Sequence, residues 1–323
     1  MQSNEAPIGL FDSGVGGTSI WREIQQLLPG ERTLYLADSR NAPYGAKSQQ
    51  EIIDLSIKNT ELLLAQGCKL IVVACNTATT NAIAILRAKY KVPFIGIEPA
   101  IKPAALNSKT KAVGILATKG TLNSALFHET ANQYGSSIKR IEIVGEGLVP
   151  LIEKGIVNGP EIEHLLRQYL EPMIEAGVDY IVLGCSHYPY LIPAIKAIIP
   201  DQINIIDSGF AVARQTKAVL SEKDLLRFFT SPLKNSGTGD KTKPYNRQID
   251  GFSSAQSFHQ FWTNTDPATL KKLLGLDPNR SNEHFTLDAP RAAKSSKNNP
   301  EIRDTLSAVD LNHLDVTVIQ QDF

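Results

Sequence analysis

The chain has 323 residues, 42% of them hydrophobic and 20% charged, which excludes an intrinsically disordered protein and leaves room for two packed domains. Its 33 basic and 33 acidic residues cancel, so no net charge favours a nucleic acid or a membrane as partner. The start, MQSNEAPIGLFDSG, lacks the features of a signal peptide, and no apolar run reaches about 18 residues, so we expect a cytoplasmic protein.

Short apolar runs alternate with longer helical patterns through the first 230 residues. The runs expected to form strands are 8–11, 33–37, 69–74, 93–97, 112–117, 140–144, 179–184 and 203–207. The helix candidates between them include 18–28, 48–66, 78–90, 121–133, 161–176 and 188–199. Continuous apolar strands separated by helices are typical of parallel sheets covered on both faces. The predicted fold class is therefore α/β.

An internal repeat divides this region. The segment IGLFDSGVGGTSI (8–20) aligns with VGILATKGTLNSALF (113–127), and LIVVACNTATTNAI (70–83) aligns with YIVLGCSHYPYLIPAI (180–195). We expect two similar parallel-sheet α/β domains related by this repeat. Parallel sheets bind ligands beyond the carboxyl ends of their strands, so the active site is expected in the cleft between the domains.

The composition changes after about residue 230. A stretch rich in Ser, Gly, Pro, Lys and Asn predicts a surface insertion, and ordered sequence then resumes, with Thr-Asp-Pro opening a short helix. The expected division is a first domain of residues 1–98 plus 208–277, a second domain of 99–207, a surface insertion at 231–257 and a polar tail at 278–323.

Cys75 and Cys185 occupy matched positions of the repeat, each after a buried strand and before a helix. Nearby backbone N–H groups and the positive end of the helix dipole favour a thiolate there. Inert packing would explain either cysteine alone, but explains two matched cysteines less well. The residues that follow them offer hydrogen-bond donors to an anionic substrate: Asn76, Thr77, Ser186 and His187.

The remaining cysteine and the histidines predict no further chemistry. Cys68 lies at the end of a predicted helix and just before a strand, without the polar residues that follow the other two cysteines, so we expect a structural role. Three cysteines without a C-x-x-C pair do not form a disulfide framework. The other histidines show no ligand spacing, and we expect no metal.

The segment DSGVGG (12–17) joins the first strand to a helix. Its glycines would let backbone N–H groups approach a carboxylate or phosphate, although a simple turn with a helix cap fits equally well. It matches neither a Walker A loop nor G-x-G-x-x-G. Asp12 and Ser13 are its reactive side chains.

Three further groups are candidates for the site. Asp38 follows the second strand and precedes the turn 43–45. Thr118 and Thr121 lie three apart at a helix start, a spacing suited to binding a carboxylate. Glu153, like His187, could orient a thiol, but a surface glutamate or a packed histidine is an alternative explanation.

Two opposed thiols suit one kind of chemistry. A substrate held between them can lose a proton to one face and regain a proton on the other, which inverts its stereochemistry. A thiol with a reference pKa near 8.5 needs a dipole or a cation to ionise at neutral pH. Preorganised N–H and hydroxyl donors would stabilise the carbanion.

Seven motifs in order carry a resemblance to a known family. They are GLFDSGVGGTSI, ADSRNAPYG, VVACNTAT, GIEPAIKPA, LATKGTLNS, LVPLIE and LGCSHYP. Together they resemble the cofactor-independent glutamate racemases of the aspartate/glutamate racemase superfamily. The resemblance covers about residues 8–220 and resumes at FWTNTDPATLKKLLG.

The resemblance implies roles for individual residues. Cys75 would exchange the α-proton of D-glutamate and Cys185 that of L-glutamate. Asp12 and His187 would assist these cysteines, and Asp38 and Glu153 would support them. The residues implied to bind the amino acid are Ser13, Pro43, Tyr44, Gly45, Asn76, Thr77, Thr118, Thr121 and Ser186.

The resemblance also implies no cofactor, a homodimer, and a product, D-glutamate, that bacteria build into peptidoglycan. The chain departs from the family pattern at a few positions. Ser186 replaces a common Thr, Gly145-Glu146 replaces a frequent Cys-Pro, and Tyr190 replaces a Leu, which would place the tyrosine near the cleft mouth.

Other functions remain open at this point. Aspartate or another acidic amino acid is an alternative substrate, while retention of both cysteines argues against a one-cysteine malonate decarboxylase. A two-domain protein that only binds a small carboxylate would not need the thiols. A redox pair would require the two sulfurs to approach bonding distance.

Overall fold

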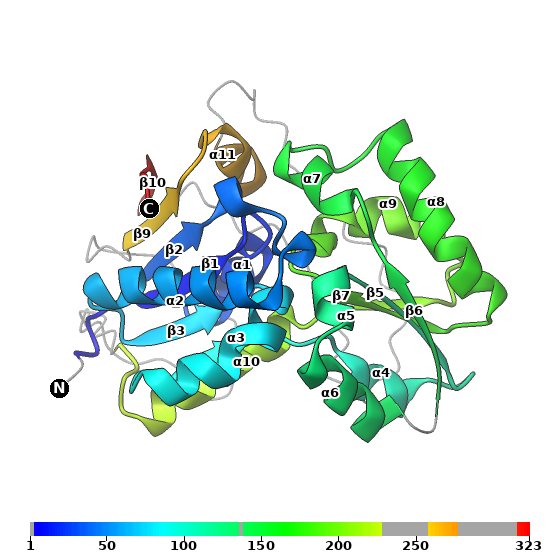
Figure 1. Ribbon diagram of the computed structural model, residues 1–323, viewed down its shortest axis with the longest axis horizontal. Coiled ribbons are helices and arrows are strands. Elements are labelled where there is room, and N and C mark those ends of the chain that lie inside the picture. Colours follow the sequence, from blue (N-terminus) through cyan, green and yellow to red (C-terminus); the bar gives the residue numbers. More distant parts are fainter. Residues whose placement is uncertain (1–2, 136–137, 228–257, 277–314) are drawn as a thin grey trace, which may run out of the picture.

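The computed structural model describes residues 3–135, 138–227, 258–276 and 315–323. Within these residues the chain forms two lobes, each built on one parallel sheet (Figure 1). The first lobe has the strand order β10-β9-β2-β1-β3-β4, and the second lobe has β6-β5-β7-β8. The first-lobe strands are β1 (Ile8–Asp12), β2 (Thr33–Ala37), β3 (Leu70–Val73), β4 (Phe94–Gly96), β9 (Phe258–Thr263) and β10 (Asp315–Gln320). The second-lobe strands are β5 (Ala112–Ala117), β6 (Lys139–Val144), β7 (Tyr180–Gly184) and β8 (Asn204–Ile206).

Helices connect the strands and cover the sheets. The α-helices are α1 (Thr18–Leu27), α2 (Gln49–Ala65), α3 (Asn76–Lys89), α4 (Ile101–Asn107), α5 (Lys119–Leu122), α6 (Ala125–Gly135), α7 (Leu148–Glu153), α8 (Pro160–Glu175), α9 (Ile192–Lys196), α10 (Gly209–Glu222) and α11 (Ala268–Leu274). Short 3-10 helices are η1 (Ser39–Asn41), η2 (Tyr44–Ala46) and η3 (Tyr188–Leu191). Local sequence sets several ends: Ser48 and Glu51 form a capping box at the start of α2, and Gly275 ends α11 in the left-handed region with φ 79°.

The two lobes share one topology, which confirms the predicted repeat. The order β2-β1-β3-β4 in the first lobe corresponds to β6-β5-β7-β8 in the second, and every neighbouring pair is parallel. The aligned segments of the sequence fall on corresponding strands, β1 with β5 and β3 with β7. The predicted α/β class with two similar parallel-sheet domains is therefore correct.

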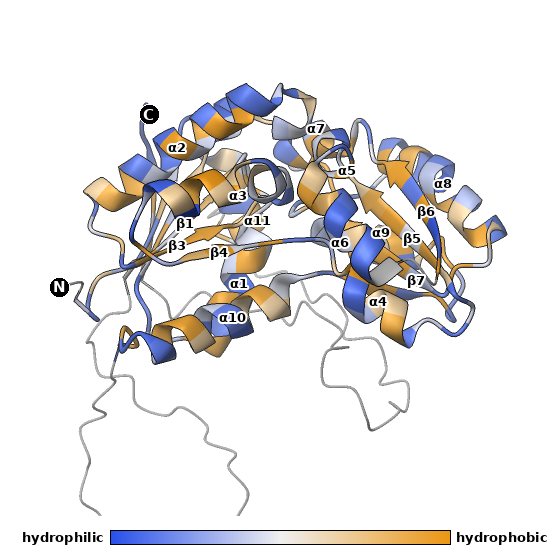
Figure 2. Ribbon diagram, turned by 60° about the horizontal axis from the view of Figure 1, so that its bottom comes forward, coloured by the Kyte–Doolittle hydropathy of each residue, from blue (hydrophilic) through white to orange (hydrophobic). Residues whose placement is uncertain are grey.

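Alternate residues of the first-lobe strands pack on opposite faces of the sheet. Ile8 and Leu10 join a core on one face with Trp21 of α1, while Phe11 joins a core on the other face with Ile52 of α2. Helices therefore cover both faces, as the continuous apolar strands predict. In Figure 2 the central strands are coloured hydrophobic and the hydrophilic colour gathers on the helices.

Two predicted helices are divided differently in the structure. The expected helix 121–133 is two helices, α5 and α6, because the Ser124 hydroxyl accepts the N–H of Phe127 at 3.3 Å and starts a new helix. The expected helix 188–199 is η3 followed by the short α9. Pro189 and Pro193 lie in their first turns, where a missing N–H costs no hydrogen bond.

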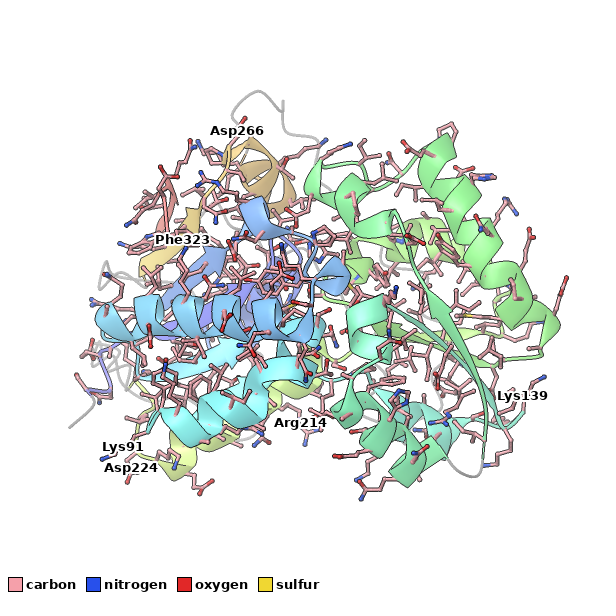
Figure 3. The ribbon with its side chains drawn as sticks, in the orientation of Figure 1. Lys91, Lys139, Arg214, Asp224, Asp266 and Phe323 are labelled. Carbon is pink, nitrogen blue, oxygen red and sulfur yellow. The ribbon has the colours of Figure 1, made fainter. Side chains whose placement is uncertain are left out.

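The carboxyl-terminal region contributes two strands to the first lobe. β9 pairs with β2, and β10 pairs with β9 at the outer edge of the sheet. Phe323, labelled in Figure 3, packs against the core on the Phe11 face. Sequence reasoning assigned no element to 315–320.

The insertion expected at 231–257 lies outside the described residues. The predicted domain boundaries at 98/99 and 207/208 stay a proposal, and β10 of the first sheet lies within the segment expected to be a polar tail. In the described ranges, no helix has the length and apolar character needed to span a membrane.

Candidate active site

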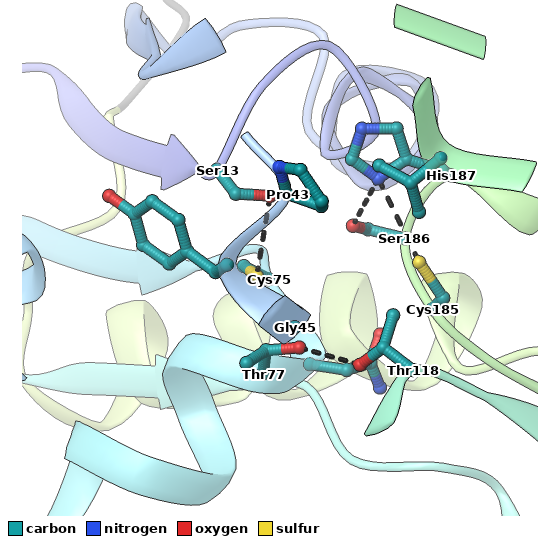
Figure 4. A pocket seen from close by; sticks show the side chains of 12 residues that line it. Ser13, Pro43, Gly45, Cys75, Thr77, Thr118, Cys185, Ser186 and His187 are labelled. Carbon is teal, nitrogen blue, oxygen red and sulfur yellow. Dashed lines mark hydrogen bonds between the residues drawn. The ribbon is translucent and has the colours of Figure 1, made fainter. Parts of the chain in front are cut away.

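The carboxyl ends of both sheets meet at one pocket, shown in Figure 4. Its walls come from the loops after β1, β2 and β3 in the first lobe and after β5 and β7 in the second, together with α7. The lining residues are Ser13, Pro43, Tyr44, Gly45, Cys75, Asn76, Thr77, Thr118, Val149, Cys185, Ser186 and His187. The cleft site predicted from the repeat thus corresponds to a pocket formed by both lobes.

Cys75 is buried at the amino terminus of α3. Its Sγ accepts the N–H of Ala78 at 3.5 Å and lies 3.8 Å from the hydroxyl of Ser13. Burial raises the pKa of the Cys75 thiol, and the charge of Asp12 raises it further, while hydrogen bonds from Ala78 and Ser13 only partly offset this. Cys75 is therefore a protonated thiol at neutral pH, and the helix terminus alone does not make it a thiolate.

Cys185 has a different environment in the second lobe. Its Sγ lies 3.8 Å from Nδ1 of His187, whose Nε2 lies 2.5 Å from Oε1 of Glu153. Burial alone would lower the pKa of His187. The hydrogen bonds to Cys185 and Glu153 and the charges of Asp12 and Glu153 outweigh burial and raise that pKa well above its usual value. His187 is therefore an imidazolium at neutral pH, within reach of Cys185.

The glycine-rich loop after β1 binds a carboxylate of the protein itself. Glu153, at the end of α7 in the second lobe, accepts the N–H of Val15 at 2.8 Å. A Cβ at Gly14 would overlap the Glu153 carboxylate, and one at Gly16 would overlap the His187 ring. Glycine is required here because another part of the chain approaches the backbone closely. One N–H of the loop binds the Glu153 carboxylate and another, that of Gly14, binds Asp12 in a local turn, so a cradle for a substrate anion stays a prediction.

Asp12 ends β1 and lies behind the pocket wall, fully buried. It accepts the N–H of Gly14 at 2.9 Å and the hydroxyl of Ser186 at 2.7 Å. Burial raises the pKa of Asp12, and the charge of His187 opposes that rise. Asp12 reaches Cys75 through its charge, so the predicted assistance to this cysteine stays a prediction.

Asp38 organises the loop of residues 38–45, which we call the 38–45 loop. Its carboxylate accepts hydrogen bonds from Tyr44 Oη at 2.5 Å, Asn41 Nδ2 at 2.8 Å and Asn264 Nδ2 at 2.5 Å. The side chain is buried, and these bonds hold the loop whose residues line the pocket. Asp38 therefore shapes the pocket wall.

Three hydroxyls from the two lobes meet at the far side of the pocket. Thr77 Oγ1 lies 2.8 Å from Thr118 Oγ1 (Figure 4). Thr121 Oγ1 lies 3.3 Å from Thr77 Oγ1 and 3.1 Å from Thr118 Oγ1. Next to them, both side-chain amide atoms of Asn76 are buried without a hydrogen-bond partner among the described residues. An unpaired buried amide costs about 1–3 kcal/mol, which a bound polar group would recover.

The structure brings most predicted site residues to the pocket surface and keeps four behind it. The four are Asp12, Asp38, Glu153 and Thr121, each hydrogen-bonded to a residue of the lining. Cys68 lies outside the pocket lining, and burial raises its pKa to about 12.

Three residues of the site were missed by the sequence prediction. Val149 lines the pocket, the Ser39 hydroxyl binds Oε2 of Glu153 at 2.9 Å, and Asn264 binds Asp38. Their positions in the sequence could have indicated them. Ser39 and Asn264 follow the carboxyl ends of β2 and β9, and Val149 lies within the LVPLIE motif. In the part of the chain that the structure describes, no group of three or more His, Cys, Asp or Glu is arranged to hold a metal ion.

The sequence model of the Asp/Glu/hydantoin racemase family matches residues 8–216. The chain belongs to this family. It is thus an enzyme of the racemase class. Within this family, the relatives that it resembles are glutamate racemases. The glutamate racemase of Ectopseudomonas mendocina (strain ymp) is 48% identical over 227 residues, which cover 70% of this chain and 86% of that protein.

Solved structures of glutamate racemases share the fold. Glutamate racemase isoform RacE1 from Bacillus anthracis superposes with a TM-score of 0.69 at 27% identity, covering 84% of this chain and 95% of that one. Escherichia coli glutamate racemase, in complex with L-glutamate and the activator UDP-MurNAc-ala, superposes with a TM-score of 0.67 at 30% identity, covering 84% and 94%. These racemases have a two-lobed fold like that of this chain.

Proposed function

We propose that the enzyme interconverts L-glutamate and D-glutamate by proton transfer between two thiols, without a cofactor. One observation carries the proposal: Cys75 and Cys185, from corresponding strand ends of the two lobes, line one pocket from different sides (Figure 4). Proton removal on one face of a substrate and proton delivery on the other need two such groups. The glutamate racemases to which the chain is similar support glutamate as substrate.

The polar groups of the pocket suit an amino acid with two carboxylates. The unpaired amide of Asn76 and the hydroxyls of Thr77 and Thr118 offer donors, and α3 presents its amino terminus to the same wall. Such donors stabilise the negative charge that develops on the substrate carboxylate when the α-proton leaves. We assign these residues to substrate binding.

The two thiols differ in their proton supply. His187, held as an imidazolium by Glu153, can exchange a proton with Cys185, whereas Cys75 is a buried thiol beside Ser13. We assign Cys185 to the α-proton of L-glutamate and Cys75 to that of D-glutamate. A thiolate at Cys75 requires a cation nearby, and the ammonium group of the substrate can supply that charge.

The biological role follows from the product. D-Glutamate formed in this way would supply peptidoglycan synthesis in a bacterium. The homodimer implied by the family resemblance stays a prediction.

Racemisation can be tested with purified protein and L-glutamate in D2O, without added cofactor. We expect the circular dichroism signal of the amino acid to decay to zero and its α-proton resonance to disappear. In the initial phase, chiral separation should show deuterium in the D-glutamate formed, while the remaining L-glutamate keeps its proton. The reason is that the delivered hydrogen comes from the second thiol, which exchanges with solvent.

Three variants complete the test. Cys75→Ala and Cys185→Ala should prevent both changes, so that the circular dichroism signal and the α-proton resonance persist. Cys68→Ala, at a buried cysteine outside the pocket lining, should retain activity. Early deuterium in the residual L-glutamate would contradict the two-thiol assignment. Reaction of aspartate but not glutamate would mean a different substrate, and reaction of no acidic amino acid would favour a carboxylate-binding protein.

A further inference from the structure

Asn264 is a buried residue just after β9 whose side chain has a partner at each end. Its Nδ2 donates to Oδ1 of Asp38 at 2.5 Å, and its Oδ1 accepts the backbone N–H of Arg40 at 2.9 Å. One amide therefore bridges the first residue of the 38–45 loop and the backbone two residues later. Asparagine suits this place because its amide carries a donor and an acceptor on separate atoms, which can bind two partners at once.

The bridge comes from outside the 38–45 loop. Asp38 also accepts hydrogen bonds from Asn41 and Tyr44, which belong to the loop itself, and Asn59 of α2 donates to Tyr44 Oη at 3.0 Å. A carboxylate that collects three donors is strongly held, because hydrogen bonds to a charged group contribute more than those between neutral groups. Asn264 is the link between this carboxylate and the carboxyl-terminal region of the chain.

The 38–45 loop has little room to move without changing the pocket. Tyr44 and Gly45 line the pocket, and a Cβ at Gly45 would lie 2.8 Å from Cβ of Thr118 in the second lobe. The loop therefore packs against one of the hydroxyls assigned to substrate binding. A shift of about 1 Å in such a wall can reduce catalytic efficiency by as much as 10²-fold.

We propose that Asn264 is a positioning residue for the reaction: it holds Asp38 and the backbone of Arg40 so that the 38–45 loop presents Tyr44 and Gly45 to the substrate. This role rests on the proposed racemisation of glutamate. It also gives the segment after β9, which lies far from the thiols in sequence, a function in substrate binding.

The test compares Asn264→Ala and Asn264→Asp with Thr265→Ala. Thr265 is the next residue, and its hydroxyl contacts Thr263 instead of the 38–45 loop, so this variant controls for loosening of the segment. For Asn264→Ala we expect KM for glutamate to rise about tenfold or more, with a smaller change in kcat, because the lost contact acts on binding in ground and transition states alike. Thr265→Ala should keep the KM of the wild type.

Asn264→Asp separates positioning from general stability. The introduced carboxyl group faces the carboxylate of Asp38, so repulsion and burial raise the pKa of one of the pair. When protonated, the introduced group can donate to Asp38 as the amide does. We therefore expect kcat/KM, taken relative to wild type at each pH, to recover as pH falls from about 8 to 6 for Asn264→Asp and to stay flat for Asn264→Ala.

Hydrogen exchange gives a readout that does not depend on the substrate. Amides of the 38–45 loop should exchange faster in Asn264→Ala than in Thr265→Ala, at matched global stability. Unchanged loop exchange together with an unchanged KM would overturn the proposal, as would an equal loss in all three variants. If the wild-type enzyme does not racemise glutamate, the proposed function fails, and the exchange data still decide whether Asn264 holds the loop.

Discussion

The carboxylate of Glu153 contacts three other residues. It accepts the N–H of Val15 and the hydroxyl of Ser39, both from the first lobe, and it contacts the ring of His187 in the second. These bonds keep the imidazole oriented toward Cys185. A carboxylate that orients a histidine also stabilises its protonated form, so Glu153 sets both the place and the charge of the ring.

Replacing this carboxylate by an amide should shift a titration. In Glu153→Gln burial, which lowers the pKa of His187, remains, and one of the two negative charges that raise this pKa is lost, while that of Asp12 remains. We expect His187 to lose its proton at lower pH, so the alkaline limb of kcat/KM for glutamate should move to lower pH and kcat should fall about 10²-fold. Glu146→Gln, at an exposed glutamate, serves as the control, and an alkaline limb that stays in place in Glu153→Gln would contradict the assigned proton supply.

His259 on β9 is a second buried histidine, with the opposite shift. Its Nδ1 lies 2.8 Å from Thr33 Oγ1, and burial lowers its pKa to about 4. In the unfolded chain a histidine titrates near 6.5, so between about pH 6.5 and 4 the unfolded state binds more protons. Folding stability should therefore fall as pH falls through this window, by up to about 3 kcal/mol.

The variant His259→Gln tests this linkage. Glutamine keeps a polar group for Thr33 but does not titrate, so the loss of Tm between pH 6.5 and 4 should be smaller than in the wild type. His164→Gln, at an exposed histidine of α8, should show the wild-type slope. Equal slopes for all three proteins would mean that His259 is not buried as a neutral ring.

Single residues of the site were predictable where a motif places them after a strand. Cys75 and Cys185 could be found in this way because they follow corresponding strands and precede polar residues. The occupant of the glycine-rich loop could not be predicted, because Glu153 is 138 residues from Val15 in the chain and its approach depends on how the lobes pack. The glycines of this loop indicate that another group approaches its backbone closely, but they do not identify that group.

At the scale of elements, a buried ion pair connects the residue before β3 with the segment before β2 and with the segment that follows α10. Lys69 Nζ lies 2.6 Å from Glu31 Oε2, and Glu31 Oε1 accepts the backbone N–H of Arg227 at 2.9 Å. Both side chains of the pair are almost completely buried, with 0% and 3% exposed. Water does not solvate either of these buried charges, so each is stabilised mainly by the opposite charge of its partner.

Removing one charge of this pair should destabilise the fold. Lys69→Met leaves the Glu31 carboxylate buried without its cation, and we expect the free energy of unfolding in urea to fall by about 3–5 kcal/mol. The double variant Lys69→Met/Glu31→Leu should recover most of that loss. Lys89→Met, in the exposed pair with Glu61, should change stability little, and an equally small effect at Lys69 would refute the argument.

Elements were predictable where their residues form a clear apolar run in the sequence. The strands β1 to β3, with every residue buried, appear in the sequence as continuous apolar runs. β10 could not be predicted, because its sequence DVTVIQ is short, its side chains from Val316 to Ile319 are only partly buried, and an edge strand carries a weak pattern. Its partner β9 also follows a long segment that separates it from β2, so no local signal indicates their pairing.

At the scale of the whole molecule, the internal repeat predicted two lobes and a shared cleft, since corresponding strand ends must carry corresponding loops. The contacts that join the lobes were not predictable. Tyr190 on η3 hydrogen-bonds to Thr18 on α1, and the guanidinium of Arg22 lies 6.0 Å from the centre of its ring. The departure from the family pattern at Tyr190 is thus a lobe-to-lobe contact, and only the packed structure identifies its partner.

The strand order of the first lobe has a consequence for synthesis of the chain. All four strands of the second lobe lie between β4 and β9 in sequence, so they leave the ribosome before the first sheet is complete. The amide of Asn264, which bridges the 38–45 loop, is made later than every residue of the pocket lining. A nascent or prematurely terminated chain can carry both thiols and still lack this clamp, so full activity would begin only when translation is nearly finished.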